Sequence, residues 1–360
     1  METREEYNTH SEDVEEELVE KRRVQVIECD AAYECWPCVG GLLKLGYEFN
    51  AQGRLCDKST GEVAVLKDPN PDDIEGKIRI ARLLTAIRNE IPTVFASRFS
   101  MKFIKLPLEK GCEGKQNGFL IASADLTTNQ SGLVVLIEGF GTAGQWDPML
   151  VLSEGLELGS QLWCVSKCIN RGWAVLIMDA SCSCTSRKNV RLKQKAVGEA
   201  EDRERGSDYG GYDTKCLHFC WGSCLQKLVD IWERFVLGLS VQKVAIIAHR
   251  CGGLLAENIL KSAAACDRLK AVCLSDWTLS AMPCEAWWHM AVPRTRHWVP
   301  SARPCGAREK TRNGVRCASA GTKDPRRIPS SAADDMLGFI REMFDSDLGN
   351  VREPHSLPTV

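Results

Sequence analysis

The sequence lacks the features that would place it in a membrane or in the secretory pathway. No stretch of about 18 consecutive apolar residues occurs, so the sequence predicts no transmembrane helix. The first 20 residues are acidic and carry no apolar run of the kind that a secretory signal needs. We therefore expect a nuclear or cytoplasmic protein that is not secreted and has no membrane partner.

The sequence also lacks an excess of charge of either sign. Its 46 Lys and Arg residues are nearly balanced by 48 Asp and Glu residues, which leaves a formal net charge of −2. A protein that binds nucleic acid through its overall charge has a basic excess, so direct nucleic-acid binding is not expected. Hydrophobic residues make up 44% of the chain, which is enough to build a core.

Cysteine is plentiful, but spacing typical of a metal site is missing. Cys35 and Cys38 form a CxxC pair that has no second pair at a finger-like distance. Three further cysteines, Cys216, Cys220 and Cys224, recur every four residues, which on a helix forms one stripe. A buried apolar stripe is favoured over a metal site there. The sequence therefore predicts neither a metal ion nor another cofactor, and in a reducing compartment its cysteines stay thiols.

Continuous apolar runs alternate with segments of helical pattern in the middle and last parts of the chain. The runs cover residues 133–137, 174–178, 244–248, 271–274 and, more weakly, 315–320. The helical segments cover about 157–170, 222–238, 253–265 and 332–344. Uninterrupted β-branched runs separated by helices are typical of a parallel sheet that is covered on both faces. The sequence thus predicts an α/β fold with a mostly parallel sheet flanked by helices, like that of the α/β hydrolases.

An antiparallel hairpin and one helix are expected before this sheet. Residues 46–57 alternate apolar and polar side chains around the turn signal Asn50-Ala51-Gln52-Gly53, which predicts a β-hairpin. Apolar residues at helical spacing predict an amphipathic helix that ends at about Asn89.

Four further segments are defined by their lack of a regular apolar pattern. Residues 1–38 are expected to form a flexible arm and residues 346–360 a tail, on either side of one domain over 39–345. Residues 181–213 mix charge and glycine, which predicts a mobile loop. Residues 277–327 show no clear period, so the sequence assigns them no structure.

The run 244–248 leads into a pattern that is typical of a nucleophile elbow. It is followed by His249-Arg250-Cys251-Gly252-Gly253 and then by a helical segment. The place of the attacking serine is taken by Arg250, whose guanidinium stays protonated and cannot attack a carbonyl. Cys251 comes one residue too late, and its use as a nucleophile would require the turn to shift by a full residue.

Of the other residue types that hydrolase chemistry requires, only some occur at the expected positions. Glu138 and Gly139 end the first apolar run, where hydrolases often have a histidine followed by glycines, and the negative charge of Glu138 opposes an oxyanion. Asp276 follows a strand, as a triad carboxylate would, although a helix cap or a loop hydrogen bond explains it equally well. No histidine closely follows the last predicted strand. We expect Arg250 to point to solvent or to pair with Glu138 or Asp276.

Several of these segments resemble a known family. The segments GYEFNAQGRLCDKSTGE, LVVLIEGFGTAGQWDPMLVLSEGLELGSQ, RGWAVLIMDA and VAIIAHRCGGLLAENIL resemble the cotranscriptional-regulator family known as family with sequence similarity 172. Its core is the Argonaute-binding-protein-two domain, an α/β-hydrolase relative. The resemblance extends over about residues 40–340, and Gly144-Gln145-Trp146 is its most specific part.

The resemblance also assigns the chemical positions. In the family, a serine falls on Arg250, a histidine on Glu138, an aspartate on Asp276, and a histidine on about Pro325. Three of these four positions therefore depart from the family pattern. The resemblance implies partners of the Argonaute, splicing or chromatin kind, largely in the nucleus.

Three hypotheses about function follow. The first is a non-catalytic, hydrolase-like interaction protein that is linked to RNA silencing, chromatin or cotranscriptional splicing, as its relatives are. The second is a degenerate or atypical esterase that uses Cys251 or an unusual set of residues. The third is a decayed gene copy without function, which the irregular composition of residues 277–327 motivates.

Overall fold

A computed structural model describes residues 41–66, 73–105, 119–138, 143–179, 229, 231–261, 267–277 and 286–346. The predicted arm over 1–38, the loop over 181–213 and all but the first residue of the tail over 346–360 lie outside these ranges. The CxxC pair, the cysteine row of 216–224 and Gly139 lie outside them as well. Among the described helices, none combines the length and apolarity needed to cross a membrane.

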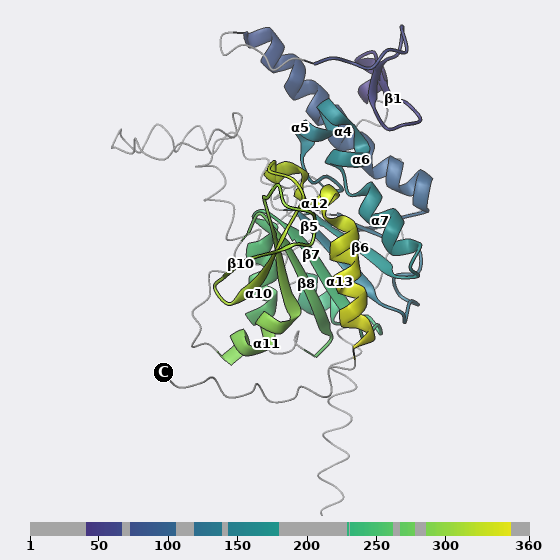
Figure 1. Cartoon of the computed structure of the whole chain (residues 1–360). Helices are drawn as coiled ribbons and strands as arrows, with labels where there is room; N and C mark the ends of the chain where they lie inside the picture. The colour runs from purple at the N-terminus through teal and green to yellow at the C-terminus, as the bar shows by residue number, and fades with distance from the viewer. Residues whose placement is uncertain are drawn as a thin grey trace, which may run out of the picture.

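A nine-stranded sheet forms the centre of the described molecule (Figure 1). Its strands are β3 (Lys102–Lys105), β4 (Phe119–Ala122), β5 (Leu133–Glu138), β6 (Ala174–Asp179), β7 (Val244–His249), β8 (Leu269–Ser275), β9 (Thr295–Val299), β10 (Arg308–Arg312) and β11 (Val315–Ser319). Their order is β10-β11-β9-β8-β7-β5-β6-β4-β3. Six neighbouring strands pair in parallel, namely β6, β5, β7, β8, β9 and β11. Only β3, β4 and β10 run antiparallel to their neighbours. Apart from the added β10, this is the strand order of an α/β-hydrolase sheet, which confirms the predicted fold class.

The two faces of the sheet are covered by different helices. One face packs on α4 (Ile74–Phe99), α5 (Pro148–Glu154), α6 (Leu156–Gly159), α7 (Leu162–Ile169), α12 (Ile328–Ser331) and α13 (Ala333–Asp345). The other packs on the π-helix η1 (Trp232–Val236), α10 (Gly252–Lys261) and α11 (Ala286–Arg294). All six residues of β5 are buried, with Val134 on the first face and Val135 on the second. Because both faces are covered, the central strands read as continuous apolar runs.

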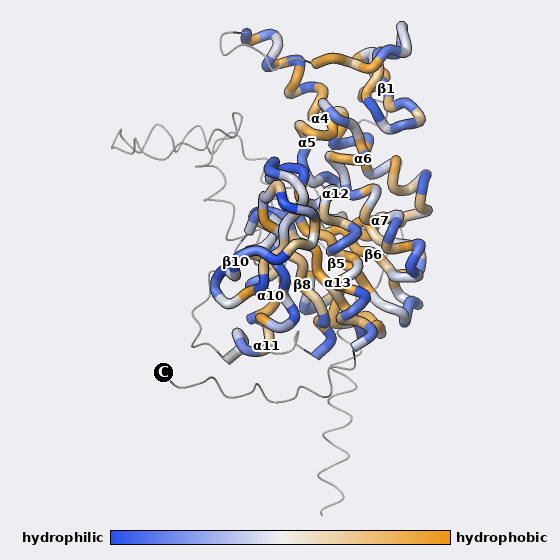
Figure 2. The backbone as a smooth tube through the Cα atoms, viewed as in Figure 1, coloured by the Kyte–Doolittle hydropathy of each residue, from blue (hydrophilic) through white to orange (hydrophobic). Residues whose placement is uncertain are grey.

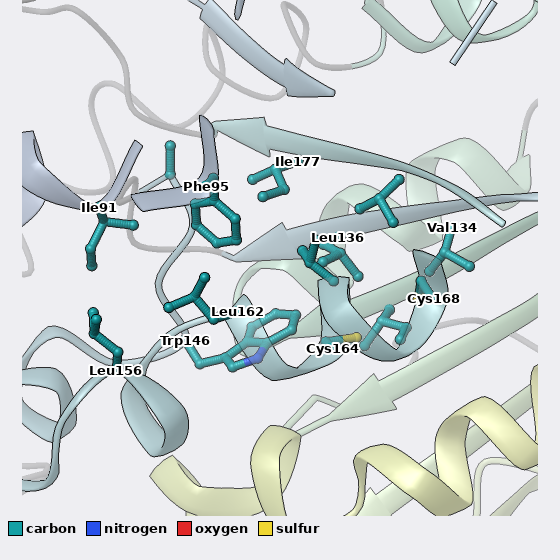
Figure 3. Close-up of a cluster of buried hydrophobic side chains, with 14 of the residues drawn as sticks. Ile91, Phe95, Val134, Leu136, Trp146, Leu156, Leu162, Cys164, Cys168 and Ile177 are labelled. Atoms are coloured by element: carbon teal, nitrogen blue, oxygen red, sulfur yellow. The ribbon is translucent and has the colours of Figure 1, made fainter. Parts of the chain in front are cut away.

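The core of the first face gathers around Trp146, which is 2% exposed. Figure 3 shows Phe95 of α4, Leu162 of α7 and Leu136 of β5 in the same cluster. The turn before Trp146 needs glycine at position 144, because its φ is +79° and a Cβ there would lie 2.4 Å from the Phe95 ring. The most specific part of the family resemblance thus has a packing role.

The first predicted elements are present, with one helix longer than expected. β1 (Tyr47–Phe49) and β2 (Leu55–Asp57) pair antiparallel, which confirms the hairpin. The helix predicted to end at about Asn89 continues to Phe99 as α4. It passes Pro92 because apolar side chains on its buried face continue through Phe95, and that packing outweighs the helix-breaking effect of proline.

Residues 277–327, for which the sequence shows no clear period, contain α11 and three strands of the main sheet, of which only β11 was predicted, as the weak apolar run 315–320. β9 lies between β8 and β11 and is parallel to both. It is buried although it carries Thr295 and His297, and these polar residues hide the apolar pattern of a central strand. The irregular composition that motivated the decayed-copy hypothesis therefore belongs to an ordered part of the sheet.

Gly159 and Gly338 provide a matched test of this packing. A Cβ at Gly159 would lie 2.1 Å from the backbone nitrogen of Val151, whereas a Cβ at Gly338 in α13 meets nothing within 4 Å. We expect Gly159→Ala to lower the free energy of unfolding by about 2 kcal/mol or more. Gly338→Ala should raise it by up to about 1 kcal/mol, because alanine favours a helix. Urea unfolding measures both values, and equal effects of the two substitutions would contradict the packing described for α6.

Candidate functional site at the turn between β7 and α10

The turn between β7 and α10 has the geometry of a nucleophile elbow, with Arg250 at its tip. Arg250 has a φ of +50°, a conformation that few residues other than glycine adopt. Its backbone N–H donates to the carbonyl of Ser275 at 2.9 Å, and its carbonyl accepts from Gly253 at 2.9 Å. The two backbone bonds hold the strained residue between the end of β8 and the start of α10.

The two glycines of the turn are required by close packing. A Cβ at Gly252 would lie 2.6 Å from the carbonyl oxygen of Ile137 in β5. A Cβ at Gly253 would lie 2.2 Å from the ring of Trp277. The glycines that indicated an elbow in the sequence therefore let α10 begin directly against β5 and the end of β8.

The guanidinium of Arg250 is buried between two carboxylates. Its Nη2 lies 3.0 Å from Oδ2 of Asp147, with the side chains 9% and 7% exposed. Its Nε lies 3.8 Å from Oδ2 of Asp276, which is 30% exposed. One cation thus faces two acidic groups in a region of low solvent access, where ion pairing offsets part of the cost of desolvation.

Asp147, the nearer of the two carboxylates beside Arg250, is not predicted by the sequence pattern. The expectation that Arg250 points to solvent is wrong, because its side chain is buried, whereas the expected pair with Asp276 is present. Asp147 also caps α5, since its Oδ1 accepts from the backbone N–H of Leu150 at 2.9 Å. The sequence does carry the cap signal, an aspartate followed by Pro148 and an apolar run, but not the second contact.

Burial shifts the pKa values of two side chains near the turn, the carboxyl of Asp276 and the thiol of Cys251. Burial raises the pKa of Asp276, while Arg250 and Arg312 oppose that shift. Cys251 is partly exposed, and burial together with the nearby charge of Glu138 raises the pKa of its thiol. The thiol is therefore protonated near neutral pH, the form that is a poor nucleophile. Glu138 itself is buried at the end of β5, next to His249 in the sheet register.

A serine and a histidine lie within hydrogen-bonding distance below the turn. Nδ1 of His249 is 2.9 Å from Oγ of Ser275, and both residues are fully buried. The Ser275 hydroxyl also donates to the carbonyl of Ala248 at 3.3 Å. Burial, and secondly the charge of Arg250, lowers the pKa of His249 well below its usual range, so the imidazole is neutral. The sequence does not reveal this pair, because its two residues are 26 positions apart and meet only through the pairing of β7 with β8.

The remaining candidate positions lie away from the turn. Pro325, which has no titratable side chain, begins a 3-10 helix, η3 (Pro325–Arg327), that packs against α6. His297 lies in β9 with its Nδ1 3.9 Å from Sγ of Cys317, and burial lowers its pKa to about 4. His289 is exposed on α11. In the described ranges, no three His, Cys, Asp or Glu side chains are grouped so that they could hold a metal ion.

The buried ion pair should dominate the stability of this region. Arg250→Met leaves the Asp147 carboxylate buried without its cation, and we expect it to lower the free energy of unfolding by about 3–5 kcal/mol. Adding Asp147→Asn removes that charge while keeping an oxygen that can cap α5, so the double variant should regain part of the loss. Urea unfolding of the wild type, the two single variants and the double variant measures the coupling energy between the two positions. No coupling between the two substitutions would contradict the ion pair.

The low pKa of His297 predicts a loss of stability in acid. Below about pH 6.5 the unfolded chain protonates this imidazole while the folded chain, with a pKa of about 4, does not. Stability should therefore fall by up to about 3 kcal/mol between pH 6.5 and pH 4 on account of this residue. His297→Gln should flatten the pH dependence of urea unfolding, whereas His289→Gln, at an exposed position, should leave it unchanged. An unaltered profile in His297→Gln would refute the assignment.

Comparison with known proteins places this geometry in a family. Residues 41–305 match the Arb2 domain family. The chain is 24% identical over 283 residues to the cotranscriptional regulator ARB2A of Mus musculus, covering 70% of this chain and 66% of that protein. It is 25% identical over 242 residues to a FAM172 family protein homolog of Caenorhabditis elegans, covering 66% and 65%. The matches to these two relatives thus span just under two thirds of their length.

A solved structure gives a weaker match. The fold is similar to that of a histone deacetylase chain from Saccharomyces cerevisiae, with a TM-score of 0.46 and 12% identity over 73% of this chain and 98% of that chain. The family match, by contrast, covers well over half of the 360 residues and agrees with the resemblance seen in the sequence. The chain belongs to the Arb2 domain family.

Proposed function

We propose that this protein is a non-catalytic, hydrolase-like interaction protein that takes part in gene regulation linked to RNA silencing, chromatin or splicing. The observation that carries the proposal is the buried ion pair of Arg250 with Asp147 at the tip of the elbow. This cation occupies the position from which a serine hydroxyl would attack in a working hydrolase.

The chemistry at the turn supports the absence of acyl transfer. A guanidinium remains protonated and has no lone pair with which to attack a carbonyl. The partly exposed Cys251 has a raised pKa, and the buried Glu138 is a negative group near the place where an oxyanion would need hydrogen-bond donors. These three groups all oppose the same reaction, and none of them prevents the domain from folding or from binding a partner.

The family supports a regulatory role for the retained fold. The relatives in mouse and chicken are named cotranscriptional regulators, and the name refers to those proteins. We infer partners of the Argonaute, splicing or chromatin kind and a location in the nucleus, the cytoplasm or both. A scaffold of this kind needs the sheet and its surfaces and does not need a catalytic triad.

One observation favours a second candidate function, an atypical hydrolase. The pair of Ser275 and His249 has the distance of a nucleophile and a general base, 2.9 Å. Both side chains are fully buried, and Ser275 ends β8 instead of standing at the tip of the turn. A substrate would reach this hydroxyl only after the turn opened, which would break the ion pair of Arg250.

A fluorophosphonate probe for serine nucleophiles, together with a chloroacetamide probe for cysteine, separates the two candidates. We expect no active-site labelling of the purified protein, and no more than background in Arg250→Ser, because the buried histidines that the structure describes face other groups: His249 faces Ser275, and His297 lies beside Cys317. Heat-denatured protein and an active serine hydrolase serve as the two controls. Labelling of the folded protein that disappears in Ser275→Ala or Cys251→Ala would overturn the non-catalytic proposal.

Affinity purification from nuclear extract tests the regulatory part of the proposal. We expect Argonaute, splicing or chromatin proteins to be enriched over a catalytically active α/β hydrolase used as the control bait. The extract is treated with nuclease beforehand, so that enrichment reports contacts between proteins. Recovery of none of these three classes would refute the proposed role, even if the probes confirm that the protein has no hydrolase activity.

A further inference from the structure

The balanced net charge of the chain hides a local excess of cations at one edge of the sheet. Residues 294–327 contain ten Lys and Arg residues but only two acidic residues, Glu309 and Asp324. This segment forms β9, β11 and the edge strand β10. Figure 2 shows hydrophilic colouring along β10, in contrast to the apolar central strands. At physiological salt, charges more than about 8 Å away are largely screened, so acidic residues elsewhere do not cancel this field.

The cations form a row across neighbouring strands. Arg316 of β11 lies directly beside Arg296 of β9 in the sheet register. Arg308 of β10 pairs with Ala318, which lies two residues after Arg316 and therefore on the same face. Lys310 lies on the same edge strand, within the register shift between Glu309 and Arg312, and is exposed. We define Arg296, Arg308, Lys310 and Arg316 as the cationic edge.

This edge is exposed and lacks compensating acidic partners. Arg308, Lys310 and Arg316 are exposed, and none of the ion pairs in the described part of the chain includes them. Arg296 lies over the ring of Phe339 at 4.3 Å, a contact with an aromatic ring and not with a carboxylate. Like charges placed side by side in a sheet oppose folding, so a row of this kind is a cost that an anionic ligand would relieve.

The form of the edge favours recognition through side chains. The pairing of β10 with β11 shifts register between Glu309 and Arg312, which marks a β-bulge. A bulge interrupts the regular backbone groups that an added peptide strand would need. Arginine, which supplies three of the four cations, matches phosphate oxygens with paired N–H donors. A phosphodiester backbone carries a negative charge at every nucleotide, whatever its sequence.

We propose that the cationic edge binds the phosphate backbone of a nucleic acid. This proposal departs from the expectation drawn from the net charge, because that expectation treated the charges as evenly spread. It goes beyond the proposed function and is independent of Arg250, which lies at a different place in the sheet. Binding through the backbone predicts little dependence on nucleotide sequence and a strong dependence on salt.

The test measures fluorescence anisotropy of a labelled single-stranded RNA of 20 nucleotides with the purified full chain, between 50 and 200 mM salt. We compare wild type with the triple variant Arg308→Gln, Lys310→Gln, Arg316→Gln. Removing three phosphate contacts should make the slope of log affinity against log salt shallower by about 2. At 50 mM salt the affinity should fall roughly tenfold or more.

The matched control is a triple variant of exposed arginines on α4: Arg79→Gln, Arg82→Gln and Arg98→Gln. It removes the same charge from another surface and should retain the wild-type affinity and slope. Cooperative thermal melting of both variants verifies their folding. The proposal is overturned if wild type does not bind the RNA at 50 mM salt, or if both variants lose affinity equally. It is also overturned if polyglutamate displaces the RNA at equal charge concentration, since the edge would then accept acidic peptides.

Discussion

The buried contact between Arg250 and Asp147 is the constraint on which the site depends. It joins the turn after β7 to the first residue before α5, and through Asp276 it reaches the end of β8. A guanidinium in a buried position is tolerated only with such partners, because an unpaired buried charge costs several kcal/mol. The same contact fills the tip of the elbow, so the interaction that stabilises this region also occupies the place where acyl chemistry would occur. Arg250 thus both stabilises this region and takes the position at the tip of the turn that a serine has in a nucleophile elbow.

The sequence predicts those strands whose two faces are both covered. β5, β7 and β8 appear as uninterrupted apolar runs because each successive side chain packs against one layer of helices or the other. β9 and β10 do not follow that pattern, for opposite reasons. β9 is buried but accommodates polar side chains at Thr295 and His297, whereas β10 at the edge is exposed at every residue except the half-buried Glu309. Neither a buried strand with polar side chains nor an exposed edge strand produces an apolar periodicity, so β9 and β10 are identified only by how they pair with other strands.

In the site, residues fixed by the local turn could be predicted from the sequence, whereas contacts between segments far apart in the chain could not. Arg250, Cys251 and Asp276 could be placed from the sequence because glycines and strand ends fix a turn locally. Asp147 could not, since it lies 103 residues before Arg250 and its cap signal accounts for the residue without any second role. The pair of His249 and Ser275 joins adjacent strand ends, and only the register of β7 with β8 brings these residues together. Contacts between strands that are far apart in sequence are therefore what sequence patterns omit.

The arrangement of charge gives the two parts of the sheet different capacities for binding. At the ends of β7 and β8, the one cation is buried between two carboxylates, so no uncompensated positive charge is left there to attract an anionic ligand. At the edge formed by β10 and β11, Arg308, Lys310 and Arg316 are exposed and belong to no ion pair of the described residues, because the acidic residue of that edge, Glu309, pairs with Arg303. A charged group attracts a ligand of opposite charge more strongly when neighbouring groups do not cancel its electric field. The ion pair of Arg250 fills the tip of the elbow. The cationic edge is consequently the described surface that is better suited to attract a charged partner.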